Sequence, residues 1–497
     1  MLTPLLALVA IPGCGFTSPR QVTLQGTQRL SASQPSDPMV VLRRAAEVMG
    51  LPRVGKHVLE VRGSDIVAQD FQSDRSYAPF LSDVAPLDYW YDPATRRERF
   101  AIGFGMAGFQ STGPTIVSDQ QSTFVLRDTL RVPSEGAHAA AYETRALNAW
   151  AVIGDWLEDG GVQIAGTCVY RDYPRLVLSR KGARGTERLY VDPKSGFPVK
   201  LERVEPHYLW GQNLVEYVYS TWQRLGDTAI PGVSFRVVDG LTNVERNITT
   251  MRLVSADSAP SFTMPHRDVA MGYAPAGFLN PVPPDTIRIG AQAFLLKNPG
   301  YTELVALARD TVFLFDATQG EARSRADSLW IARLFPGRHA VALVVTDLAW
   351  PHIAGVRFWV ARGATVYGHH AARAFLDSVV ARRWWLEPDA LERARSSTRF
   401  HFVAVSDTTR VGGGHLLLFA IDGVASEIAL AGYLADDRFL WGSDYIQDAS
   451  QPSMYLDEVC RAVRRVSREP VQVAAEHLAV TPWSMLLPLA RCEARPS

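Results

Sequence analysis

The feature that most constrains the fold is a short apolar run near the middle of the chain, Ala342–Val345, which is followed at once by a polar loop. An uninterrupted apolar run of this length, bounded by loop residues, predicts a buried β-strand. The loop begins with Thr346 and Asp347, contains a single His352 and ends at Gly355. Because α/β folds place binding and catalytic side chains where such strands end, the sequence predicts a functional site here.

Length and composition limit the class of protein. The chain has 497 residues, which is too long for one ordinary core and predicts at least two domains. A content of 47% hydrophobic and 21% charged residues is typical of globular proteins. Basic and acidic residues number 51 each, so the chain has no overall field that would favour nucleic acid as a partner.

The first residues have the pattern of an export signal. Residues 1–13 are almost continuously apolar, but the run is too short to span a bilayer. Gly13 and Cys14 resemble the cleavage site of bacterial lipoproteins, which implies that Cys14 carries the lipid. We therefore predict a signal peptide with its lipobox at 1–16 and a Ser-, Gln- and Thr-rich tether at 17–37. The expected location is the bacterial periplasm or outer membrane, with membrane attachment through the Cys14 lipid alone; a plain signal peptide is the alternative.

The other cysteines are Cys168, Cys460 and Cys492, and they show no CxxC spacing that would indicate a zinc ribbon or a redox motif. If Cys14 carries a lipid, three cysteines in an exported chain leave one free thiol or an intermolecular bridge. Cys460 and Cys492 flank the last expected strand and are candidates for a disulfide. Cys168 lies in an apolar run, which predicts a buried thiol.

Residues 38–258 predict an α+β domain in which one helix precedes a curved antiparallel sheet. Pro38–Met49 has the apolar spacing of an amphipathic helix, and residues 57–258 show a succession of strands and turns. Turn residues at 192–196, between two alternating runs, indicate a hairpin. This order resembles the open β half-barrel of the lipoprotein-carrier and lipoprotein-sorting families. The resemblance implies a lipid or lipidated partner, although aromatic residues on such strands are equally typical of ordinary sheet core.

A Pro- and Gly-rich stretch, 259–284, predicts a linker. The order of expected elements then changes in residues 285–497. Strands at 287–296, 301–308 and 311–315 precede a helix at 323–334 and the strand that leads to Thr346. This order, with the loop described first, resembles the metallo-β-lactamase fold. The resemblance implies an αββα sandwich, in which two sheets lie between two layers of helices.

The resemblance also assigns metal-ligand positions, which are only partly retained. In that family the strand ends in Thr-His-x-His-x-Asp-His, and here Thr346 and His352 match. Asp347 stands at the first His position. Residues that offer no side-chain donor occupy three further ligand positions: Ala349, Pro351 and Ala425. Since a methyl group cannot donate an electron pair, the resemblance implies that the first of the family's two metal positions is empty.

The second metal position keeps three polar residues: His352, Asp444 and His477. Two imidazoles and a carboxylate are compatible with one Zn or Fe ion, and Asp347 is a candidate fourth ligand. We expect these groups to hydrogen-bond one another in place of holding a tight metal, and keep a single-ion site as the alternative.

Three functions are therefore open. The first is a non-catalytic binding or scaffold role for an exported, lipid-anchored protein. The second is a mononuclear metal-dependent hydrolase that uses His352, Asp444 and His477. The third is binding of lipid or a lipoprotein by the first domain. No serine-hydrolase elbow or phosphate-binding loop is found in the sequence, and its pattern identifies no substrate.

Overall fold

The fold is known from a computed structural model, which describes residues 35–492 except for 36, 72–76, 107–108, 120, 128–129, 134, 183–184, 265–283, 299, 338, 422, 424–427 and 448. The predicted signal peptide, Cys14 and nearly all of the predicted tether lie outside the described residues. So do Ala425 and most of the predicted linker.

The chain divides into two compact units, each composed of several segments. Unit 1 contains residues 1–68, 82–206 and 213–276, and unit 2 contains 69–81, 207–212 and 277–497. The predicted domain 38–258 is therefore not continuous, because two of its segments group with unit 2. The aromatic residue Trp350 explains this grouping: its ring meets those of His207 and Trp210, and its backbone N–H donates to the carbonyl of Phe71.

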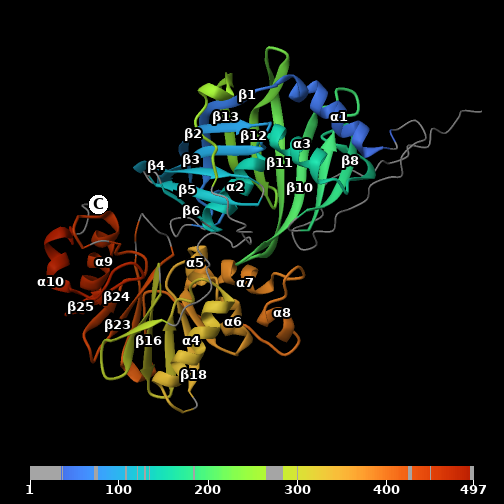
Figure 1. The fold of residues 1–497 in the computed structure, drawn as a ribbon. Helices are drawn as coiled ribbons and strands as arrows, with labels where there is room; N and C mark the ends of the chain where they lie inside the picture. The colour runs from blue at the N-terminus through green and yellow to red at the C-terminus, as the bar shows by residue number, and fades with distance from the viewer. Residues whose placement is uncertain are drawn as a thin grey trace, which may run out of the picture. The chain divides into compact units, whose positions relative to one another are not determined.

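Unit 1 is built from one large antiparallel sheet and a few helices (Figure 1). Its helices are α1 (Pro38–Val48), η1 (Leu51–Arg53), α2 (Glu135–Ala146), α3 (Ala149–Asp159) and η2 (Ala256–Ser258). Its strands are β1 (His57–Ala68), β2 (Ser82–Asp92), β3 (Arg97–Met106), β4 (Phe109–Ser118), β5 (Thr123–Arg127), β6 (Leu130–Pro133), β7 (Gln163–Tyr170), β8 (Tyr173–Gly182), β9 (Gly185–Val191), β10 (Pro198–His207), β11 (Gly211–Leu225), β12 (Thr228–Val238) and β13 (Leu241–Ser255).

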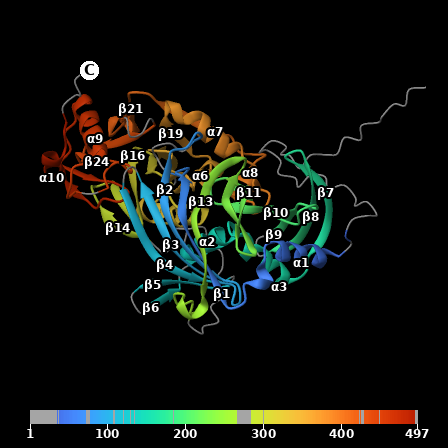
Figure 2. The same cartoon turned by 90° about the horizontal axis from the view of Figure 1, so that it is seen from above.

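The strand order of this sheet is β6-β5-β4-β3-β2-β1-β13-β12-β11-β10-β9-β8-β7. The first strand pairs with the last in the middle of the sheet, with His57 opposite Ser255, and β6 and β7 are the two ends of the strand order. The sheet curls around α1 and α3, as Figure 2 shows. Buried Leu42, Trp150 and Trp156 from these helices pack against strand residues such as Tyr217 in one core.

Two helices of unit 1 correct the sequence analysis, which predicted only strands and turns between residues 57 and 258. They are α2 and α3. Their sequence is rich in alanine, Asn148 caps α3 by accepting from the backbone N–H of Trp150, and Gly160 ends it. The β-rich neighbourhood obscured these local helix signals.

Ion pairs join α2 to α3 and to the sheet. Arg145 of α2 makes two hydrogen bonds to Asp155 of α3, and Arg236 of β12 lies 2.9 Å from Glu143 of α2. Polar contacts therefore fix α2 beside the apolar core that α1 and α3 form with the sheet.

Unit 2 contains two sheets and several helices. The strands of one sheet are β14 (Asp285–Arg288), β15 (Ala293–Asn298), β16 (Tyr301–Ala308), β17 (Thr311–Phe315), β18 (Ala340–Val345), β19 (Thr365–His369) and β20 (His401–Val405), in that order. Those of the other are β21 (Thr408–Val411), β22 (Leu416–Ala420), β23 (Leu430–Leu434), β24 (Phe439–Trp441), β25 (Gln472–Ala474) and β26 (Thr481–Pro482). The helices are α4 (Glu321–Leu334), α5 (Trp350–Ile353), α6 (Val356–Ala361), η3 (His370–Ala372), α7 (Arg373–Ala381), α8 (Ala390–Ala394), η4 (Gly412–Gly414), α9 (Met454–Arg465), α10 (Trp483–Leu486) and η5 (Leu487–Leu489).

Three apolar cores define the layers of unit 2. One core lies between the two sheets and includes Phe315 and Trp441. A second joins the outer face of the β14–β20 sheet to α4, α6 and α7, and a third joins the β21–β26 sheet to α9 and α10. The layer order is thus helices, sheet, sheet, helices, which is the order that the resemblance implied.

The cysteines differ in part from expectation. Cys460 of α9 and Cys492 form a disulfide with a Cα–Cα distance of 5.2 Å. Cys168 is buried and also disulfide-bonded, so the prediction of a buried free thiol is wrong.

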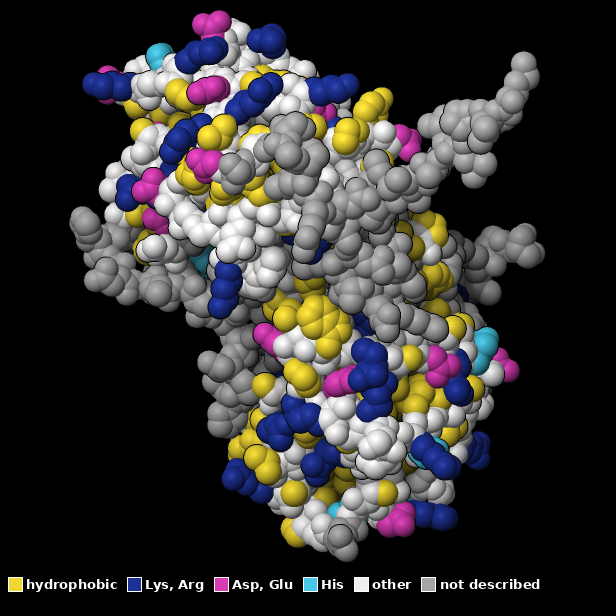
Figure 3. Space-filling view, turned by 90° about the vertical axis from the view of Figure 1, so that its right-hand side faces the viewer, with side chains coloured by type: hydrophobic (Ala, Val, Ile, Leu, Met, Phe, Trp, Pro, Cys, Tyr) yellow, Lys and Arg dark blue, Asp and Glu magenta, His cyan; other side chains and the backbone are white. Residues whose placement is uncertain are grey.

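Two further observations concern the surface and the helices. Basic and acidic side chains are interspersed over the face in Figure 3, as their equal numbers predict. Of the helices in the described ranges, none is both long enough and apolar enough to cross a membrane.

Candidate metal centre

The loop after β18 is held by Asp316, which follows β17. The Asp316 carboxylate accepts from the backbone N–H of Thr346 at 2.8 Å and from its hydroxyl at 2.6 Å. Asp347 then accepts from the backbone N–H of Ala349 at 2.8 Å, and Pro351 lies in the first turn of the short helix α5, which carries His352. The local sequence thus fixes the direction in which the His352 ring leaves the loop.

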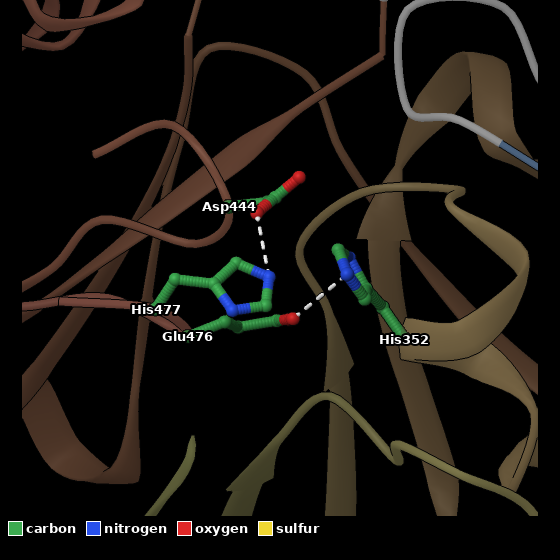
Figure 4. Close-up of side chains that lie close together, drawn as sticks. All are labelled: His352, Asp444, Glu476 and His477. Carbon is green, nitrogen blue, oxygen red and sulfur yellow. Dashed lines mark ion pairs between the residues drawn. The ribbon is translucent and has the colours of Figure 1, made fainter. Parts of the chain in front are cut away.

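Four side chains converge beside this loop: His352, Asp444, Glu476 and His477. Each offers one ligand atom, and these atoms all lie within 4.8 Å of one another. Figure 4 shows the two imidazole rings, each next to a carboxylate. Nε2 of His352 lies 2.9 Å from Oε2 of Glu476, and Nε2 of His477 lies 3.3 Å from Oδ1 of Asp444.

Each imidazole is also held by a group outside this cluster. Nδ1 of His352 lies 2.9 and 3.0 Å from the two carboxylate oxygens of Asp347. His477 forms a hydrogen bond with the backbone of Gly300. Such outer partners fix the tautomer and orientation of metal-binding histidines, and leave the other ring nitrogen for the ion.

Three of the four predicted metal ligands lie in the cluster, and the fourth lies outside it. His352, Asp444 and His477 are brought together, although they come from distant parts of the sequence. Asp347 lies outside the cluster and contacts Nδ1 of His352, so it orients a ligand instead of serving as one. Ala349 and Pro351 place no side-chain donor in the loop.

Glu476 is the member that sequence analysis missed. It lies just beyond the end of strand β25, after Ala475, and its side chain is fully buried, with 0% of its surface exposed. The available signal was an acidic residue at the end of an apolar run, immediately before the retained His477. A buried carboxylate in that position requires a proton, an ion pair or a cation.

Burial and mutual repulsion dominate the electrostatics of the cluster. Burial raises the pKa of Asp444 to about 7 and that of Glu476 to about 8. Burial alone would lower the pKa of His352, but the carboxylates of Asp347, Glu476 and Asp444 outweigh it and hold that pKa well above its usual value. Burial and the neighbouring His352 lower the pKa of His477. Near neutral pH the metal-free cluster therefore holds protons on its acidic groups, Glu476 above all, and a bound cation would take the place of those protons.

These residues fit one divalent cation and do not fit two. Within the described part of the chain, Oε1 of Glu476 is buried and has no hydrogen-bond partner, so it is an oxygen that a cation could coordinate. Two imidazole nitrogens and two carboxylate oxygens are a donor set that zinc accepts. The family's other metal position does not fit, because Asp347 is engaged by His352 and Ala349 offers no donor.

The cluster has one edge near solvent. The side chain of His477 is 32% exposed and that of Asp444 is 13% exposed, whereas those of His352 and Glu476 are 4% and 0% exposed. The ring of Tyr301, at the start of β16, lies against both imidazoles, with centroid distances of 5.7 Å to His352 and 5.3 Å to His477. An ion would therefore enter past His477 and Asp444.

Comparison with known proteins gives a partial likeness. No family model matches the chain, and no curated protein matches it. Among solved structures, one similar structure is the DIM-1 metallo-β-lactamase. The match covers 42% of this chain and 95% of that enzyme, with 13% sequence identity and a TM-score of 0.33. A metallo-β-lactamase from Pontibacter korlensis is similar to 41% of this chain over 95% of its own length, with 16% identity and a TM-score of 0.32. At these scores the site is best interpreted from its own geometry.

Proposed function

We propose that unit 2 is a non-catalytic domain of metallo-β-lactamase type that binds a single divalent cation. The ligands are His352, Asp444, Glu476 and His477. The observation that carries the proposal is the arrangement of the two imidazoles: each is held by an outer hydrogen-bond partner while its Nε2 faces a buried carboxylate. Zn²⁺ suits this mixed nitrogen and oxygen set best, and Fe²⁺ is the next candidate.

The number of donors supports a structural role for the ion. Structural zinc sites use four protein ligands, whereas catalytic sites use three and keep one position for water. Here Glu476 supplies a fourth donor in addition to the three retained residues. The ion would neutralise the buried carboxylates and hold together loops that follow β18, β24 and β25. The domain would then act by binding a partner through its surface, and the ion would take no part in a reaction.

The rival function is a mononuclear hydrolase with the same ligands and a metal-bound water. It is favoured by the exposed edge at His477 and Asp444, where a substrate would approach. Hydrolysis of an ester, a lactam or a phosphodiester by the zinc-loaded protein, abolished by His352→Ala, would support the rival and refute the non-catalytic proposal.

The test of metal binding uses the full chain after dialysis against a chelator. We expect titration with Zn²⁺, followed by calorimetry and native mass spectrometry, to give one ion per chain. Glu476→Gln and His352→Ala should each abolish tight binding. His415→Ala is the matched control, because His415 is an exposed histidine paired with Asp436 in the same unit and outside the cluster. A wild-type protein that binds no Zn²⁺ or Fe²⁺ refutes the proposal.

We also propose that the protein is exported. The disulfide between Cys460 and Cys492 and the disulfide-bonded state of Cys168 support this, because such bonds persist in oxidising compartments. Cell fractionation with and without residues 1–16 tests it. The mass of the mature chain decides whether Cys14 carries a lipid.

A further inference from the structure

The four proposed ligands come from two different sheets. His352 lies on α5, in the loop that follows β18 of the first sheet. Asp444 follows β24, and Glu476 and His477 follow β25, both in the second sheet. The donors can therefore converge on one ion only while the ends of the two sheets keep a fixed offset.

Ser443 joins the two sides of the site. It follows β24, is fully buried, and its hydroxyl lies 2.6 Å from the hydroxyl of Thr346 on the opposite sheet. The same hydroxyl donates to Oδ2 of Asp347 at 2.9 Å. Asp347 in turn contacts Nδ1 of His352. One hydroxyl thus links the second sheet to the residue that orients His352.

Ser443 has a left-handed backbone conformation, which indicates that its side chain has a specific role at this position. Its φ is +57°, in the left-handed region that glycine adopts without strain and other residues adopt at a cost. The two contacts of its hydroxyl explain why a serine occupies this position. Other links between the sheets do not involve its hydroxyl, such as the hydrogen bond from the N–H of Leu430 to the carbonyl of Thr346 at 2.7 Å. Loss of the hydroxyl should therefore leave the fold intact.

We infer that Ser443 is a positioning residue, which acts through Asp347 to hold the His352 ring with Nε2 toward Asp444, Glu476 and His477. This inference rests on the proposed metal-binding function. Sequence comparison with the metallo-β-lactamase pattern placed Asp347 at a metal-ligand position. The inference gives it another role: Asp347 connects Ser443 to the proposed ligand His352.

The experiment measures Zn²⁺ affinity for Ser443→Ala and Ser443→Gly in the full chain. Because loss of an outer partner typically weakens metal binding by 10- to 100-fold, we expect a loss of about 10-fold in both variants. Ser443→Gly also relieves the left-handed backbone, so it should not lower the melting temperature of the metal-free protein although it weakens binding. Affinity and stability that change together would indicate a merely structural role and overturn the inference.

Two further measurements define the route. If Ser443 acts through Asp347, Ser443→Ala should have no further effect on affinity in an Asp347→Ala background, since coupled residues are not additive. The visible absorption of bound Co²⁺ should also change in Ser443→Ala, because the ring of one ligand is no longer fixed. Full additivity of the two losses, or an unchanged Co²⁺ spectrum, counts against the inference.

Ser324→Ala is the matched control. Ser324 lies on α4, is fully buried like Ser443, and within the described residues its hydroxyl has no hydrogen-bond partner. Its removal should leave Zn²⁺ affinity unchanged. The two proposals fail differently: a wild-type chain that binds neither Zn²⁺ nor Co²⁺ refutes the metal site and the inference with it. A wild-type chain that binds Zn²⁺ no better than Ser443→Ala refutes the positioning role alone.

Discussion

Glu476→Gln should make the metal-free protein more stable while abolishing its metal binding. The side chain of Glu476 is fully buried, and its close cationic neighbour among the described residues, His352, already contacts the carboxylate of Asp347. Glutamine keeps the shape and an oxygen that can accept from the imidazole. It removes a carboxyl group whose ionisation is opposed by burial, so that the metal-free protein must bind a proton there at neutral pH.

The distances give the sign and the size of this effect. With an effective dielectric constant of about 20, two unit charges at the 2.9 Å separation of Glu476 and His352 attract by ~6 kcal/mol. Repulsion from Asp444, whose ligand atom lies within 4.8 Å, removes at least ~3 kcal/mol of that attraction. Desolvation of a buried carboxylate costs several kcal/mol, which exceeds the remainder. We therefore expect Glu476→Gln to gain about 2 kcal/mol without metal.

The assay is calorimetric unfolding of the full chain in the presence of a chelator. For a unit of this size, a gain of about 2 kcal/mol raises the melting temperature of unit 2 by about 4–8 °C. Zn²⁺ at one hundred times its Kd should then stabilise the wild type by about 2.7 kcal/mol and leave Glu476→Gln unchanged. Glu469→Gln, at an exposed position of the same unit, is the control for the charge change.

One result would refute this reasoning. If Glu476→Gln lowers the stability of the metal-free protein by about 3 kcal/mol or more, the buried pair with His352 is itself a net stabilising interaction. The cluster would then be a structural ion pair in which a protonated histidine replaces the metal.

The remaining predictions concern Glu98 and the disulfide. Burial raises the pKa of Glu98 to about 7, so the folded state binds its proton more tightly than the unfolded state. The contribution of Glu98 to the stability of unit 1 should therefore be greatest below pH about 4 and fall by ~3 kcal/mol as the pH rises through 7. Denaturant unfolding at pH 5 and 8.5 should show that Glu98→Gln removes this pH dependence, whereas the control Asp88→Asn keeps it. An equal change in the free energy of unfolding between the two pH values for wild type and Glu98→Gln would contradict the prediction. Cys460→Ser should cost unit 2 about 4 kcal/mol in thermal or denaturant unfolding, because the bond to Cys492 closes a loop with a sequence separation of 32. An unchanged midpoint would show that the loop is constrained without the bond.

Sequence analysis identified elements whose local pattern and packing agree. The apolar run before Thr346 is the buried strand β18, and the helix predicted from residue 323 is part of α4, Glu321–Leu334. His352, Asp444 and His477 were predicted from the resemblance to the metallo-β-lactamase ligand positions, and the structure places them after strands of two different sheets.

The features that sequence analysis missed depend on contacts between distant segments. Glu476 has no local signal beyond its place after β25, and its role is evident only from its distance to His352. Asp347 was assigned as a possible ligand because its position matched one, whereas its distance to Nδ1 makes it an orienting group. The segments 69–81 and 207–212 group with unit 2 because of aromatic contacts with Trp350, which no periodicity encodes.

The pairing of β1 with β13 bears on how the protein is made and how it can be divided. The edge of β1 that pairs with β13 has no partner until the ribosome has produced residues up to Ser255. The two halves of the sheet of unit 1 are therefore not joined during most of its synthesis. Unit 2 is likewise tied to earlier segments, since His207 and Trp210 pack on Trp350. A fragment that starts at residue 277 would expose that indole to water, so we expect the isolated C-terminal half to aggregate unless residues 69–81 and 207–212 are supplied to it.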